Sequence, residues 1–110
     1  MGKYLVVFTT FPDRRTAEKI CEMLVKEKLA ACCQIISDIK SIYWWKNKLE
    51  KSKECLVLIK TEKSLLQQLT KAILSNHPYQ IPEIVSFEIT YIEKKYRLWM
   101  DEILIKPKKL

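Results

Sequence analysis

The longest extended pattern in this 110-residue chain runs from Ala30 to Thr61 and is interrupted only at Lys46-Asn47. Asn tolerates the left-handed backbone that two-residue hairpin turns require, so the stretch predicts one long hairpin. With that turn, residue i of the first arm opposes residue 93 minus i, which places Cys55 opposite Asp38. Strands usually run about five or six residues, and an isolated hairpin is barely stable in water. The outer half of this hairpin must therefore lie against another structure.

Each arm of the hairpin is connected to a further strand and an amphipathic helix. Residues 3–10 form a nearly continuous apolar run, which suggests a central strand buried on both faces. Asp13 is suited to cap a helix over 14–28, and Thr61 to Ser64 offer a cap for a second helix. The apolar residues of both helices recur at helical spacing: Ala17, Ile20, Cys21, Leu24 and Val25 in the first, and Leu65, Leu66, Leu69, Ala72 and Ile73 in the second. An extended segment over 84–91 and a last helix over 93–104 follow.

Residues 4–43 and 55–91 thus repeat the order strand, helix, strand. This order predicts an α+β, ferredoxin-like βαββαβ fold with a C-terminal helix and a long central hairpin. No linker divides the halves, so residues 1–110 are expected to form a single domain. A chain this short buries its surface only moderately, and self-association would add to the burial.

Aromatic residues gather near the tip of the hairpin. Tyr43, Trp44 and Trp45 precede the turn, and they are expected to contact another subunit or, alternatively, to cap the chain's own core. All odd positions from Cys33 to Trp45 are predicted to share one face of the arm. In the last helix, Trp99 belongs to an apolar stripe that indicates core or interface.

The segment 76–83 contains the only histidine and two of the four prolines. Pro78 biases His77 away from helical geometry, and Pro82 does the same to the residue before it. The second helix should therefore end here, in a stiff corner that fixes His77, Tyr79 and Glu83.

Composition bears on several classes of function. The chain has no apolar run long enough to span a membrane, and its start lacks the cleavage site of a signal peptide, so a soluble cytoplasmic protein without a membrane role is expected. The net charge is +7, but the lysines are interspersed with glutamates, which is typical of a solvated surface. RNA binding on the sheet would need exposed aromatics in the central strands, and residues 56–60 contain none. We therefore expect no nucleic-acid partner.

Reactive groups are sparse. The four cysteines, Cys21, Cys32, Cys33 and Cys55, have no C-x-x-C spacing and are expected to be reduced thiols. One histidine, without a nucleophile motif, a phosphate-binding loop or a diagnostic carboxylate pair, predicts a protein that is not an enzyme.

Five short motifs in register go beyond this general architecture. They are residues 7–13 (VFTTFPD), 29–32 (LAAC), 41–48 (SIYWWKNK), 58–61 (LIKT) and 77–83 (HPYQIPE). In this order and spacing they resemble the CutA divalent-cation tolerance family, and the last is the most specific. The resemblance implies a tight homotrimer whose hairpins pair between subunits, with clefts like those of PII signalling proteins. It also implies a role in tolerance of copper or other divalent metals.

The resemblance suggests a metal site that this chain retains only in part. The copper site described for a bacterial member uses a cysteine and two successive histidines, at positions that hold Thr9, Asn76 and His77 here. His77 is thus the candidate metal ligand, helped by Glu83 or Cys32, because copper and zinc sites draw three or four ligands. Alternatively, His77 caps the second helix, and Glu83 pairs with Lys60.

A second hypothesis is a PII-like trimer that binds a small ligand or a protein partner in the cleft between subunits. The cleft residues are then Thr10, Lys48, Lys60, Tyr79 and Glu83, and an anion would be the ligand. The interface residues are Tyr43, Trp44, Trp45 and Trp99.

Overall fold

The computed structural model describes residues 3–105. The predicted single domain over 1–110 includes residues 1, 2 and 106–110, which lie outside this range. In chain order the elements are β1 (Tyr4–Phe11), α1 (Arg14–Lys26), β2 (Cys32–Trp45), β3 (Lys48–Glu62), a 3-10 turn (Lys63–Leu65), α2 (Leu66–Asn76), β4 (Ile84–Glu88) and α3 (Lys94–Ile103). The predicted α+β class and element order are confirmed.

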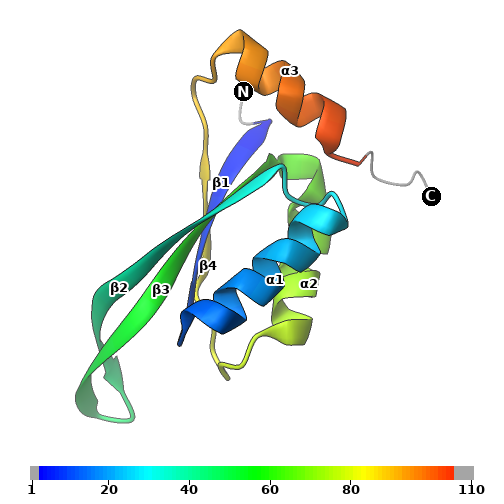
Figure 1. Cartoon of the computed structure of the whole chain (residues 1–110). Helices are drawn as coiled ribbons and strands as arrows, with labels where there is room; N and C mark the ends of the chain where they lie inside the picture. Colours follow the sequence, from blue (N-terminus) through cyan, green and yellow to red (C-terminus); the bar gives the residue numbers. More distant parts are fainter. Residues whose placement is uncertain (1–2, 106–110) are drawn as a thin grey trace.

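The four strands form one antiparallel sheet in the order β2-β3-β1-β4. Strands β1 and β2 run in the same direction with β3 between them, which is the split βαβ arrangement. Helices α1 and α2 cover the same face of the sheet, whereas α3 crosses its end near the N-terminus (Figure 1). The Tyr4 hydroxyl ties α3 to β1 by donating a 2.7 Å hydrogen bond to Asp101 Oδ1. No described helix has both the length and the apolar character needed to cross a membrane.

The two faces of the sheet differ in what covers them. Alternate residues of β1, such as Val7 and Phe11, are fully buried beneath the helices. On the opposite face Phe8 meets Phe87 of β4 edge to face, with ring centroids 5.3 Å apart, and Phe87 is 52% exposed. The expected burial of β1 is complete on the helix-covered face, whereas on the other face Tyr4 and Thr10 are buried and Val6 and Phe8 are only half-buried within a single chain. The sequence argument against exposed sheet aromatics also missed Phe8, because it considered only residues 56–60.

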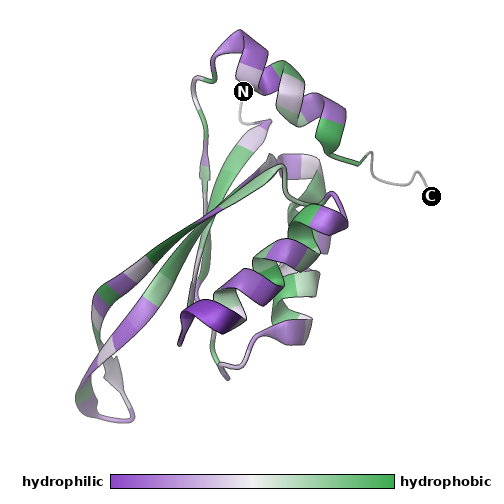
Figure 2. Ribbon diagram, viewed as in Figure 1, coloured by the Kyte–Doolittle hydropathy of each residue, from purple (hydrophilic) through white to green (hydrophobic). Residues whose placement is uncertain are grey.

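The hairpin turn is the one predicted. Lys46 and Asn47 both have positive φ, 49° and 63°, which is typical of the two-residue turns that match the strand twist. From Trp45 opposite Lys48 to Ile39 opposite Glu54, paired residue numbers sum to 93 as predicted. Hydrophilic segments alternate with hydrophobic ones along the outer part of this hairpin (Figure 2).

A β-bulge then corrects the predicted register. Between Ile39 and Ile36 the pairing shifts by one residue, so that Ile36 opposes Leu56 and Cys32 opposes Lys60. The extra residue lies at Ser37-Asp38, where Asp38 has a φ of 62°, and the predicted pairing of Asp38 with Cys55 is not made. Because side chains alternate along a strand, one extra residue moves the rest of the arm to the other face. The prediction of one shared face for all odd positions is therefore wrong.

The four cysteines are unpaired, and the start of the second helix differs from the prediction. Cys21 and Cys55 are buried, Cys33 packs against the core, and all four thiols are free. Helix α2 has no side-chain cap at its start, contrary to prediction. The Ser64 hydroxyl donates instead to Glu62 Oε2, at 3.3 Å.

Candidate ligand-binding site

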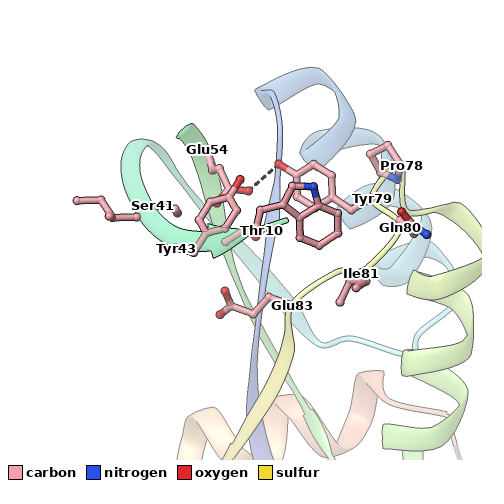
Figure 3. Close-up of a pocket in the computed structure, with 11 residues that line it drawn as sticks. Thr10, Ser41, Tyr43, Glu54, Pro78, Tyr79, Gln80, Ile81 and Glu83 are labelled. Carbon is pink, nitrogen blue, oxygen red and sulfur yellow. Dashed lines mark hydrogen bonds between the residues drawn. The ribbon is translucent and has the colours of Figure 1, made fainter. Parts of the chain in front are cut away.

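A cavity of about 670 Å³ opens where the outer hairpin faces the segment that follows α2. Figure 3 shows side chains from β1, β2, β3 and this segment around it. The lining residues are Thr10, Ser41, Ile42, Tyr43, Trp45, Glu54, Pro78, Tyr79, Gln80, Ile81 and Glu83. Its size is that of a small-molecule site.

The β-bulge brings the aromatic arm to this cavity. Beyond Asp38 the odd residues of β2 lie on the face of Ile39, which opposes Glu54. Tyr43 and Trp45 therefore join Thr10 and Glu54 on the sheet face that the helices leave open. The proline-containing segment closes the other side with Tyr79 and Glu83.

Glu54 is the deepest charged group of the cavity. The residue is 8% exposed, and its Oε2 accepts a 2.6 Å hydrogen bond from the Tyr79 hydroxyl (Figure 3). Burial, and then the hydrogen bond to Glu54, raise the pKa of Tyr79, so the phenol keeps its proton and remains a donor. The second oxygen of Glu54 makes no hydrogen bond or ion pair within residues 3–105.

His77 lies beside the cavity, and both of its ring nitrogens are occupied. Nδ1 accepts a hydrogen bond from the Tyr79 backbone N–H at 3.1 Å, so Nε2 carries the proton and donates to the Thr10 carbonyl at 2.8 Å. The ring stacks on Phe11 with centroids 4.5 Å apart. Burial lowers the pKa of His77, which favours this neutral form. His77 follows the last residue of α2, but it anchors the corner to β1 rather than bonding the helix carbonyls; Asn76 Nδ2 donates to the Ala72 carbonyl instead.

The predicted metal ligands do not come together. Cys32 opposes Lys60, and Lys60 in turn opposes Val6, four residues along β1 from Thr10. At about 3.3 Å per residue this is roughly 13 Å from the His77 end of the strand. Glu83 lines the cavity, whereas His77 does not. Within residues 3–105, no three His, Cys, Asp or Glu side chains are grouped to hold an ion, so one chain does not fit a three-ligand copper or zinc site.

Three of the five residues predicted for the cleft between subunits lie at this cavity of the single chain. Thr10, Tyr79 and Glu83 line the cavity, but Lys48 and Lys60 do not. Lys48 opposes Trp45 beside the turn, and Lys60 Nζ donates to Gln34 Oε1 at 2.9 Å and lies 5.5 Å from the Tyr96 ring centroid. The predicted ion pair of Lys60 with Glu83 is therefore replaced by these contacts, and the charge of the cavity is opposite to that expected for anion binding.

Sequence reasoning missed Glu54 and Ser41 as residues that line the cavity. Glu54 ends the polar stretch 48–54 and directly precedes the apolar run 55–59. That boundary was the available signal. The aromatic residues predicted for the interface are exposed in the single chain, most of all Trp44, at 73%. Trp99 lies beside Tyr96, with ring centroids 5.3 Å apart, and is 39% exposed.

Comparison with known proteins gives consistent matches. A family model described as CutA1 divalent ion tolerance protein matches residues 5–103. The divalent-cation tolerance protein CutA of Pyrococcus horikoshii is 36% identical over 98 residues, which are 89% of this chain and 95% of the relative. The chloroplastic protein CutA of Arabidopsis thaliana is 41% identical over 96 residues, 87% of this chain but 53% of the relative. The chain thus spans about half the length of the plant relatives it matches.

Solved structures agree with the fold. The crystal structure of CutA1 from Oryza sativa has a TM-score of 0.93 at 34% identity and covers 96% of both chains. The CutA1 structure from Thermus thermophilus has a TM-score of 0.89 at 35% identity, over 92% of this chain and 98% of that one.

Proposed function

Because this chain belongs to the CutA1 divalent ion tolerance family, we propose that it acts in divalent-cation tolerance as a cytoplasmic homotrimer that responds to a bound ligand. The proposed role is regulatory and not enzymatic, and it needs neither a membrane nor a nucleic acid. Four free thiols in the described chain accord with a reducing compartment. The observation that carries the proposal is the uncovered apolar face of the sheet.

The uncovered apolar face of the sheet is suited to bind other copies of the same chain. Val85 and Phe87 of β4 are 44% and 52% exposed, and Ile36 of β2 is 49% exposed. Their pairing with Phe8, Val6 and Leu56 puts all three on one face of the sheet. Helices α1 and α2 cover the opposite face (Figure 1). Exposed apolar surface that continues into an aromatic hairpin is typical of a permanent interface. A second and third copy of the chain, related by symmetry, would cover the apolar strands of this face and support the outer hairpin, leaving the cavity as a cleft between subunits.

Light scattering on the purified protein tests the assembly. The wild type should have three times the mass of one chain. Phe87→Lys should dissociate the trimer, because it places an ammonium group in the proposed interface, and replacing Trp44 and Trp45 with Ser should do the same. Leu74→Lys is the matched control, since Leu74 is equally exposed, at 53%, but lies on α2. A monomeric wild type, or a trimer indifferent to Phe87→Lys and to the double tryptophan variant, would contradict the proposal.

In this proposed role, divalent metal ions are the stress to which the protein responds. Copper and zinc are the ions to test. Direct ligation by His77 would require breaking the hydrogen bond to Thr10 or that from Tyr79. Calorimetric titration of the reduced protein with Cu(II) and Zn(II) should therefore give the same result for the wild type and for His77→Ala. Stoichiometric binding that is lost in His77→Ala would make His77 a ligand and replace the regulatory role with direct metal binding.

A further inference from the structure

We propose that the cavity between the outer hairpin and residues 78–83 binds an organic cation, an amine or amidine with an apolar body. This inference rests on the proposed ligand-responsive function and names the class of its ligand. Three features of the cavity carry it: its charge, its aromatic lining and the unused oxygen of Glu54.

The charge of the cavity is opposite to that of the chain. The net charge of the protein is +7, yet the charged residues of the lining are Glu54 and Glu83, both acidic. Electrostatic complementarity therefore favours a cation here.

Glu54 directs this charge into the cavity. The residue is more than nine-tenths buried, and only its Oε2 is bonded, to the Tyr79 hydroxyl. Its other oxygen has no hydrogen-bond partner among residues 3–105. This oxygen is not among the buried atoms that lack a partner, so it is open to the cavity, and an incoming N–H donor of positive charge can form a charge-assisted hydrogen bond with it. Figure 3 shows the carboxyl group beside Tyr43 and Tyr79.

The aromatic lining suits the apolar body of such a ligand. Tyr43, Trp45 and Tyr79 contribute rings, and Ile42, Ile81 and Pro78 add aliphatic surface. Aromatic faces attract cations, and Trp45 already does so, since Lys46 Nζ lies 5.9 Å from its ring centroid. A cavity of about 670 Å³ is far larger than a metal ion and matches a molecule of drug-like size.

Calorimetry with benzamidine tests the inference, with benzamide as an uncharged probe of nearly the same shape. The wild-type protein should bind benzamidine saturably and at least tenfold more tightly than benzamide, a difference of about 1.4 kcal/mol. Glu54→Gln should weaken benzamidine binding at least tenfold. The glutamine still accepts a hydrogen bond from Tyr79 but has no charge. Glu88→Gln is the matched control, because Glu88 is an exposed carboxylate at the end of β4 outside the cavity, and it should bind as the wild type does.

Glu83→Gln is a second cavity variant, which keeps the test decisive if Glu54→Gln fails to fold. Glu83 is exposed, so its replacement leaves the buried Tyr79–Glu54 contact intact and should still weaken benzamidine binding. Equal binding of benzamide, or benzamidine binding unchanged in both cavity variants, would overturn the inference. The absence of saturable benzamidine binding would also overturn the inference. Glu54-dependent binding of Mn²⁺ or of citrate instead of benzamidine would overturn it as well.

Light scattering on the same samples separates this inference from the proposed assembly. A trimer that ignores benzamidine overturns only the ligand class, whereas a monomer that binds it overturns only the assembly.

Discussion

The hydroxyl of Tyr79 donates a 2.6 Å hydrogen bond to Glu54, joining a proline-fixed corner to the middle of the long hairpin. The two residues are 25 positions apart in the chain and come from segments that sequence reasoning treated separately. Their contact fixes the distance between the two walls of the cavity.

Tyr79→Phe should therefore destabilise the protein. It removes the one hydrogen bond that the Glu54 side chain makes among the described residues and leaves its carboxylate without a protein donor, which costs about 2 kcal/mol. Denaturant unfolding measures the loss. Tyr91→Phe is the control, because Tyr91 is 78% exposed, and it should change the free energy of unfolding little. Equal stability of both variants would show that the hydrogen bond contributes nothing net.

Stability should fall as the pH drops below about 6.5, the ordinary pKa of histidine. Burial lowers the pKa of His77 in the folded state, so the unfolded chain binds the proton first. The loss begins near the unfolded pKa and is complete below the folded one. Protonation of Nδ1 also removes the acceptor for the Tyr79 N–H.

Two measurements check this pH dependence. His77 is the only histidine, so its ring signals in an NMR titration report the folded pKa without ambiguity. The free energy of unfolding of His77→Gln should vary less between pH 7.5 and pH 5 than that of the wild type. A folded pKa above 6.5 would contradict the expectation.

Two buried threonines test how much a side-chain hydrogen bond contributes to the stability of the fold. Thr9 and Thr61 are both fully buried, but Thr9 Oγ1 has no partner among the described residues, whereas Thr61 Oγ1 donates to the Leu29 carbonyl at 2.7 Å. Thr9→Val should stabilise the protein by about 1 kcal/mol, and Thr61→Val should destabilise it by about as much. Thermal unfolding of both variants measures the difference, and destabilisation by Thr9→Val would show that Thr9 has a partner that the described residues do not supply.

The bulge at Asp38 should tolerate glycine and reject valine. Asp38 has a φ of 62°, a region that glycine enters freely and that costs a β-branched residue roughly 1–2 kcal/mol. Asp38→Val should lower the free energy of unfolding by about that amount, and Asp38→Gly should change it little. Equal effects of the two substitutions would mean that the left-handed conformation is not maintained in solution.

The sequence predicted the elements well because each has a local cause. Asp13 caps α1 by accepting a hydrogen bond from the Thr16 N–H at 2.8 Å, and Lys46-Asn47 makes the turn, as expected from their side chains and backbone preferences. The bulge could not be predicted, because Ser37-Asp38 continues the extended pattern without a glycine. Because this one extra residue was not predicted, the predicted side-chain faces of β2 were also wrong.

The candidate site was predicted only where the chain is stiff. Tyr79 and Glu83 follow from the prolines, and Thr10 from its place at the end of β1. To predict Glu54 as a site residue, one would need to know which face of the hairpin contacts residues 78–83. That depends on packing between segments far apart in sequence. Lys48 and Lys60 were assigned to the cleft on charge alone.

The parity change at Asp38 has a consequence for how this protein tolerates length variation. Cross-strand partners share a face, so the side on which each outer residue of β2 lies is set by its partner on β3. Deletion of one residue at 37–38 would therefore restore a regular ladder and leave Tyr43 opposite Glu50 and Trp45 opposite Lys48, on the face of Glu54. A single insertion or deletion elsewhere in this arm would need a bulge of its own to keep these partners. The hairpin can thus lose one residue at the bulge without exchanging its inside for its outside.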